Sequence, residues 1–342
     1  MLRRTLLAGT IVLICLPAAG ARRGPTTLMQ SPVTERGWIL SIDNRRARVT
    51  APDGVRRSFR VRKHERWIDF AEAPNGWVAA GVMPLKDGLE LALVADFGGG
   101  PRRLDLPGAG EAKLQTAPRP LIGSDGLAGM VWLEGDDFRQ LSVMAADFDG
   151  HFAQPVVVSS PGRGSQTGLT AAVLADGSWL LAWSRFDGND DEIYWSRRAP
   201  AGEWSQPRRL AANNSIPDIT PHLVPHGDGA LVAWSRRVSD YEVFTSQFSS
   251  SGWSTPRPLG AAGMVKPRFQ HAAADDYLVV RNAWPAGWTA YRLDATGHPV
   301  DFASVAADSA ERPVLRSRPG AGLVFEWGSS RRTEGLRWEP AQ

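Results

Sequence analysis

The chain is poor in cysteine and tyrosine. Its 342 residues include a single cysteine, Cys15, and only four tyrosines. One cysteine cannot form an internal disulfide, so a disulfide-stapled fold is excluded and a packed core must hold the chain together. The sequence has no Walker-type phosphate loop, and no Ser-His-Asp or cysteine-nucleophile arrangement is readable in it. It also lacks a block of Lys or Arg, which argues against nucleic-acid binding.

What the chain does contain is typical of a large domain with many turns. Hydrophobic residues make up 43% and charged residues 22%, and there are 35 Gly, 25 Pro and 14 Trp. The formal net charge is +3, of which Arg3 and Arg4 contribute two, leaving +1 for the remainder. This nearly balanced charge gives no sign of a polyanionic partner.

The first 21 residues have the pattern of a secretory signal peptide. Arg3 and Arg4 precede an apolar stretch that is too short to span a bilayer, and Ala19-Gly20-Ala21 is a small-residue cleavage site. We therefore expect export to the periplasm or the extracellular space, with residues 22–36 as a linker. Lipoprotein anchoring through Cys15 is the alternative, but the bulky Ile14 before it is not typical of a lipobox.

A motif recurs along the chain at a nearly constant step. Ala182-Trp183-Ser184 and Ala233-Trp234-Ser235 are 51 residues apart, and Val131-Trp132 and Ala80-Gly81 occupy the same slot one and two steps earlier. Each copy ends a short apolar run that follows a turn containing Gly. A period near 50 built from short strands is typical of a β-propeller, in which each repeat forms one blade.

The repeats predict an all-β fold with one domain over residues 37–342. These residues accommodate six repeats of 51, so we expect a six-bladed β-propeller of four-stranded antiparallel blades. The sixth copy, around residues 322–338, is only half a blade. We expect strands from residues 37–61 to complete it and so remove the free edges. Seven blades are the alternative if residues 37–65 form a separate blade.

The blade plan resembles the sialidase-type propeller superfamily, whose BNR repeats carry an Asp box, Ser-x-Asp-x-Gly-x-Thr-Trp. Here Ser246 to Trp253 keeps the outer spacing but has Phe248 in place of Asp, and Asp147-Phe148-Asp149-Gly150 keeps Asp and Gly. The copies are degenerate. The resemblance implies three Arg that grip a carboxylate, a Tyr nucleophile paired with Glu, and an Asp acid/base. The Arg-Ile-Pro motif of that superfamily is absent, and no tyrosine has the context of a nucleophile.

Candidate ligand-binding residues come from two patterns. Three arginines precede or follow a proline at the starts of predicted innermost strands, and with His222 they would form a cationic funnel in the central channel: Arg119, Arg268 and Arg312. The alternative is that they only satisfy strand ends. Trp284 and Trp288 break the repeat pattern, so they are candidate exposed platforms, whereas Trp183 and Trp234 recur in one slot and should pack between blades.

Other polar clusters favour simpler interpretations. Asp187 to Glu192 offers enough oxygen ligands for Ca²⁺, but a solvated hairpin explains it as well. His222 and His226 lack a third ligand for zinc. We therefore assign no catalytic residue, no metal site and no cofactor.

These observations predict an exported, non-catalytic, monomeric propeller that binds a ligand or protein at one face of the ring. The ligand class we expect is a carbohydrate or another anion, without nucleic acid and without a membrane span. The alternative is a sialidase-like glycoside hydrolase acting on an anionic sugar. The distinguishing feature would be a carboxylate pair or a Tyr–Glu pair beside the arginines.

Overall fold

Strands are the only regular elements of the part of the chain that the structure describes. The computed structural model describes residues 38–43, 45–51, 53–106, 112–212, 214–237, 240–260, 263–273, 275–283, 285–307, 311–327 and 332–341. Among these residues no helix is long and apolar enough to cross a membrane. The predicted signal peptide (1–21) and linker (22–36), Cys15 and Trp284 all lie outside the described residues.

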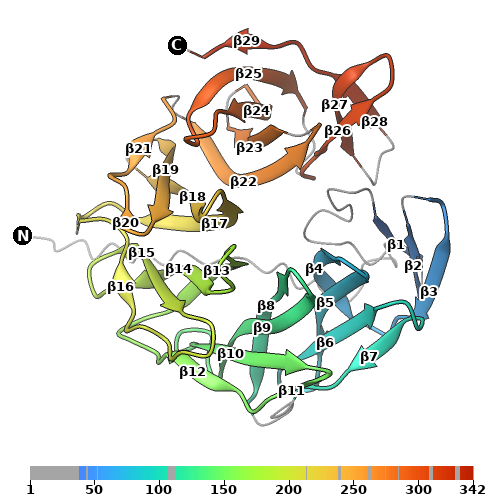
Figure 1. The fold of residues 1–342 in the computed structure, drawn as a ribbon. Coiled ribbons are helices and arrows are strands. Elements are labelled where there is room, and N and C mark those ends of the chain that lie inside the picture. The colour runs from blue at the N-terminus through green and yellow to red at the C-terminus, as the bar shows by residue number, and fades with distance from the viewer. Residues whose placement is uncertain are drawn as a thin grey trace, which may run out of the picture.

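Five blades of four or five strands follow one another around a ring, which confirms the propeller arrangement (Figure 1). Neighbouring strands within a blade pair antiparallel through short hairpins. The first blade contains β4 (Arg66–Ala73), β5 (Gly76–Pro84), β6 (Leu89–Asp96) and β7 (Arg102–Leu104), and the second contains β8 (Leu114–Gly123), β9 (Gly126–Gly135), β10 (Ser142–Asp149), β11 (His151–Phe152) and β12 (Val156–Ser159). The third blade contains β13 (Gln166–Val173), β14 (Trp179–Phe186), β15 (Asp191–Arg198) and β16 (Arg208–Arg209), and the fourth contains β17 (Asp218–His226), β18 (Gly229–Arg237), β19 (Tyr241–Ser249), β20 (Gly252–Trp253) and β21 (Arg257–Pro258). The fifth blade contains β22 (Met264–Ala272), β23 (Asp275–Asn282), β24 (Gly287–Leu293) and β25 (Pro299–Ala306).

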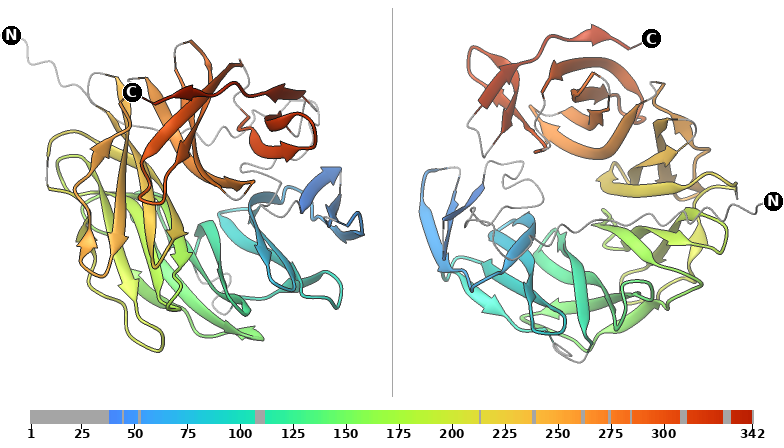
Figure 2. Two further views of the ribbon diagram at one scale, coloured as in Figure 1. Left: turned by 45° about the horizontal axis from the view of Figure 1, so that its top comes forward. Right: turned by 180° about the vertical axis from the view of Figure 1, so that it is seen from behind.

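A three-stranded sheet stands at each end of this series (Figure 2). The strands of these two sheets are β1 (Ile39–Asp43), β2 (Arg46–Thr50) and β3 (Arg56–Arg60), then β26 (Val314–Arg318), β27 (Gly322–Trp327) and β28 (Arg332–Gly335). The last strand, β29 (Glu339–Pro340), returns to pair with β25.

The structure does not show the expected six blades closed by strands from the N-terminus. Within the described residues, β1, β2 and β3 pair only with one another, and so do β26, β27 and β28. The physical reason is local: short turns join β1 to β2 and β2 to β3, so pairing them costs far less loop-closure entropy than pairing across the whole chain. The alternative of seven blades requires a separate sheet within residues 37–65. The structure contains such a sheet, but it has three strands and not the four expected of a blade.

The second strand of each blade is buried on both faces because blades stack against each other there. β14 and β18 are apolar at successive positions, and Trp183 and Trp234 are fully buried. Trp132 occupies the same slot in the preceding blade and is also fully buried. The prediction that the repeated Trp residues form the core between blades is therefore confirmed.

The first strand of each blade lies nearest the centre of the ring and is irregular at one recurring point (Figure 1). In each blade the register between the first and second strands shifts at this point. Regular pairing resumes after the shift at one residue of each first strand: Asp69 in β4, Arg119 in β8, Thr170 in β13, His222 in β17 and Arg268 in β22. Two residues before four of these positions, φ is positive at Ala117, Gly168, Thr220 and Lys266. A bulge of this kind re-aims the side chain that follows it.

Candidate functional site

The five residues that follow the bulges, together with Arg312 just before β26, form the candidate site, which we call the central cluster: Asp69, Arg119, Thr170, His222, Arg268 and Arg312. The structure thus places three of the four predicted channel residues on the innermost strands β8, β17 and β22, and Arg312 shortly before β26. None of the four is fully exposed or fully buried.

Hydrogen bonds from this cluster link successive first strands. Arg119 Nη1 lies 3.4 Å from Asp69 Oδ2, and Arg119 Nε donates to the carbonyl of Leu169 at 2.8 Å. The backbone N–H of Leu223 donates to Thr170 Oγ1 at 3.0 Å, and that of Phe269 donates to His222 Nδ1 at 3.2 Å. These bonds hold the side chains in place before any ligand arrives.

The arginines act on one another electrostatically. Burial, followed by the charges of Arg268 and Arg119, lowers the pKa of Arg312 to about 9. Burial also lowers the pKa of Arg268, with the carboxylate of Asp69 opposing the shift and Arg119 adding to it. Like charges that influence one another in this way destabilise the unliganded state, and an anion between them would relieve that repulsion.

The guanidinium of Arg312 is hydrogen-bonded through Nη2 but not through Nε. Its Nη2 donates to the carbonyl of Lys266 at 3.1 Å, and its guanidinium carbon lies 5.9 Å from the centre of the Trp288 ring. Arg312 Nε is buried without a hydrogen-bond partner among the described residues. A buried unpaired N–H costs free energy in the folded state.

His222 is neutral in this setting. Burial, and then the charges of Arg268, Arg312 and Arg119, lower its pKa well below the ordinary value. The residue as a whole is only partly buried. Nδ1 accepts a hydrogen bond from Phe269, so the neutral ring carries its proton on Nε2 and offers one donor.

The structure corrects the prediction for Trp288. This residue lies on the third strand β24, and only 1% of its surface is exposed, so its ring is not available as a platform for a ligand. Trp288 packs in a cluster with Phe325 and Trp327. The sheet β26–β28 covers the face of the fifth blade on which Trp288 lies, and without that sheet the indole would be exposed. The companion candidate, Trp284, lies outside the described residues.

The sequence analysis missed two members of the central cluster, Asp69 and Thr170, and the neighbouring Lys266. Asp69 lies 50 residues before Arg119, so a backward step of one repeat would have found it. Lys266 sits on the bulge of β22; burial and the charges of Arg281 and Arg312 lower its pKa. Lys266 nevertheless keeps contact with solvent and adds a fourth cation near the three arginines.

The tyrosines provide no evident nucleophile. Tyr277 and Tyr291 are buried, and burial raises the pKa of each phenol to about 12. The hydroxyl of Tyr291 points to Met264 Sδ at 3.4 Å, not to a carboxylate. Tyr194 lies on the third strand β15 beneath the guanidinium of Arg185.

The acidic hairpin near residue 190 is not the solvated turn that we expected. Glu192 is 1% exposed and Asp190 7% exposed, and burial raises the pKa of Glu192 to about 7. The backbone N–H and the side-chain amide of Asn214, in the loop before β17, both donate to Glu192 Oε1. Within the described residues, no group of three or more His, Cys, Asp or Glu is arranged to hold a metal ion.

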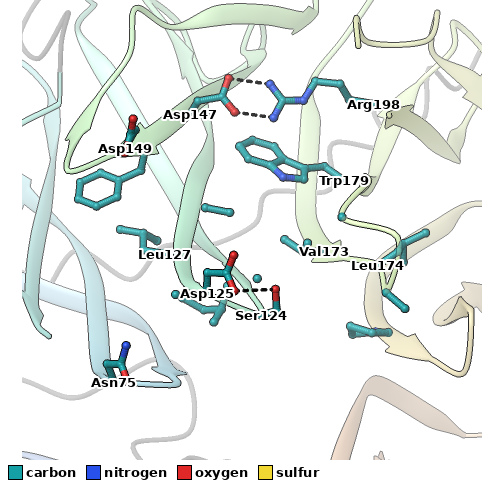
Figure 3. A pocket seen from close by; sticks show the side chains of 18 of the residues that line it. Asn75, Ser124, Asp125, Leu127, Asp147, Asp149, Val173, Leu174, Trp179 and Arg198 are labelled. Carbon is teal, nitrogen blue, oxygen red and sulfur yellow. Dashed lines mark hydrogen bonds and ion pairs between the residues drawn. The ribbon is translucent and has the colours of Figure 1, made fainter. Parts of the chain in front are cut away.

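A concave region lies where the first and second strands of the blades are joined by turns. It is a pocket of about 810 Å³ between the blades that begin with β4, β8, β13 and β17. Figure 3 shows Asp147 and Arg198 forming a two-pronged ion pair over the ring of Trp179, with Ser124 and Asp125 below them. We call it the turn-side pocket.

No protein-family model matches the sequence, and no curated protein matches it. Among solved structures, the chain is similar to a protein of unknown function from Dyadobacter fermentans DSM 18053, with 9% identity, coverage of 82% of this chain and 94% of that chain, and a TM-score of 0.51. Prolyl oligopeptidase B from Galerina marginata matches with 9% identity over 94% of this chain and 50% of its own length, with a TM-score of 0.51.

A lectin from Aleuria aurantia matches with 12% identity, coverage of 76% of this chain and 90% of that chain, and a TM-score of 0.46. Identities this low show a shared fold and nothing about activity or ligand. The comparisons therefore support the β-propeller fold, while sialidase-type repeats stay a prediction from the sequence.

Proposed function

We propose that this protein is an exported, non-catalytic propeller that binds an anionic ligand, such as an acidic carbohydrate, at the central cluster. The observation that carries the proposal is that Arg119, Arg268 and Arg312 lie close enough to influence one another electrostatically. Burial is the largest cause that lowers the pKa of Arg312 to about 9, and the charges of Arg268 and Arg119 lower it further. A carboxylate or sulfate group would gain charge-assisted hydrogen bonds from several of these cations at once.

The alternative, a sialidase-like hydrolase, is favoured by the same three arginines, because the resemblance implies that such a triad grips a carboxylate. It needs in addition a nucleophile and an acid/base group at the same place. Asp69 is a carboxylate within the cluster, but it is held by Arg119. Tyr277 and Tyr291 are buried, so neither phenol is exposed to a substrate, which supports binding without catalysis.

The proposal is tested by titration calorimetry with a matched pair of sugars, glucuronate and methyl glucoside, and with N-acetylneuraminate. We expect the acids to bind and the neutral sugar not to bind. Arg268→Met, which keeps the aliphatic stem and removes the charge, should weaken binding of the acids by about tenfold. Arg208→Ala, on the exposed outer strand β16, is the control and should bind like the parent.

Two results would contradict the proposal. One is equal affinity for glucuronate and methyl glucoside, because recognition would then not depend on charge. The other is unchanged affinity in Arg268→Met. Hydrolysis of an aryl sialoside that disappears in Asp69→Asn would replace the binding function with the enzymatic alternative.

A further inference from the structure

The turn-side pocket lies at a different part of the ring from the central cluster. The turns that join the first and second strands of four neighbouring blades meet around it, at Asn75, residues 123–126, residues 174–177 and residues 225–227. Arg119 lies within β8, whereas Asp125 lies in the turn that follows that strand. A volume of about 810 Å³ is of the size that holds a small ligand.

One wall of this pocket is built in advance by Trp179. A Cβ added to Gly129 would lie 2.2 Å from Trp179 Cη2, so the missing side chain of Gly129 is what lets the indole rest against β9. The guanidinium of Arg198 covers the indole at 3.9 Å from the ring centre. Two hydrogen bonds to Asp147, of 2.7 and 2.5 Å, fix the guanidinium in turn.

The charge that is left in the pocket is negative. Asp147 neutralises Arg198, while Asp125 and Asp149 are exposed and form no ion pair among the described residues. Asp125 Oδ1 accepts a hydrogen bond from the hydroxyl of Ser124 at 3.2 Å. Apolar surface lies beside these carboxylates, from Phe148, Leu127 and Phe97. The lining thus combines two uncompensated carboxylates with apolar walls (Figure 3).

We propose that the turn-side pocket binds a small organic cation, an amine carried on a ring-sized body such as an amino sugar. The ammonium group is attracted by Asp125 and Asp149, and the body of the ligand lies against the apolar walls. The site is independent of the proposed anion site: its charge has the opposite sign, and none of the arginines of the central cluster lines it.

The test uses two probes, the trimer of glucosamine and its fully N-acetylated form, in which each ammonium group is replaced by a neutral amide. Calorimetry at low salt should show binding of the amine trimer and at least about fivefold weaker binding of the acetylated trimer. The double variant Asp125→Asn with Asp149→Asn should lose a similar factor. Asp87→Asn, in the exposed hairpin between β5 and β6, is the matched control and should bind like the parent.

Binding of the amine trimer should survive Arg268→Met, which separates this proposal from the anion site. Equal affinity for the two trimers would overturn the proposal in favour of recognition of the sugar ring. An unchanged affinity in the double variant would overturn it as well, and so would the absence of binding at millimolar concentrations of the amine trimer. Circular dichroism of each variant confirms that a loss of binding is not a loss of fold.

Discussion

At the scale of single residues, burial decides what the repeated tryptophans do. Trp234 is fully buried between blades, and its Nε1–H has no hydrogen-bond partner among the described residues. The ring therefore contributes apolar packing at the cost of one unsatisfied polar group.

We predict that Trp234→Ala lowers the free energy of unfolding by about 3–5 kcal/mol, as expected when a large buried ring leaves a cavity. Trp234→Phe should lose much less, because it keeps most of the packing and removes the unpaired N–H. Urea unfolding followed by far-ultraviolet circular dichroism measures both variants. Equal stability of the parent and the Ala variant would show that the ring is not part of the core.

Glu192 is predicted to make stability depend on pH. Its pKa is raised from 4.5 to about 7, so between these values the folded state binds more protons than the unfolded state. The free energy of unfolding therefore falls as pH rises from about 4.5 through 7, and the cost is fully present above that window.

Glu192→Gln keeps the oxygen that accepts hydrogen bonds from Asn214 and removes the charge. We expect this variant to be about 1–2 kcal/mol more stable than the parent at about pH 8 and nearly equal to it at about pH 4. Unfolding curves at the two pH values provide the comparison. A variant that is less stable than the parent at the higher pH would show that the charged form is favoured in the fold.

At the scale of strands and turns, the repeat in the sequence predicts the strands of each blade but does not predict the pocket that lies between blades. The 51-residue step located the buried second strands, and the prolines beside Arg119 and Arg268 marked the innermost strands. The turn-side pocket has no such signal, because turns from four blades contribute to it and their approach depends on how blades stack. Trp288 was misplaced because a periodic pattern does not reveal that β26–β28 covers it.

Gly129 illustrates a contact that depends on stacking. A methyl group there would meet Trp179 Cη2 at 2.2 Å and the carbonyl oxygen of Ala146 at 2.4 Å. We predict that Gly129→Ala displaces the indole, lowers stability by about 1–3 kcal/mol and weakens ligand binding in the turn-side pocket. Gly99→Ala, in an exposed turn with open space around it, is the control for the same chemical change. Thermal melting of the two variants should differ clearly, and coincident melting curves would contradict the described packing.

At the scale of the whole molecule, the sheet β1–β3 acts as a cover for the first full blade. Phe59 stacks on Trp77 with ring centres 5.7 Å apart and meets Trp67 edge-on at 5.2 Å. Leu40, Ala47 and Val49 belong to the same core cluster as these two tryptophans. The N-terminal strands thus protect apolar surface, although they do not pair with β26–β28.

Deleting residues 38–60 should therefore expose Trp67 and Trp77 and lower both solubility and the midpoint of thermal unfolding. The expected loss is several kcal/mol, since a buried aromatic contributes about 1.5–3 kcal/mol relative to exposure. Calorimetric melting of the truncated and full chains is the measurement. An unchanged, cooperative transition in the truncated chain would mean that this sheet is dispensable for the fold.

The central claim is that the ring binds an anion through its convergent arginines, and the most direct measurement is the stabilisation that an anion confers. A ligand that binds only the folded state raises the unfolding midpoint. The account predicts that glucuronate raises the midpoint of the parent, that methyl glucoside does not, and that Arg312→Gln, which keeps a side-chain donor but removes the charge, abolishes most of the rise. An equal rise in parent and variant, or an equal rise with both sugars, would contradict it.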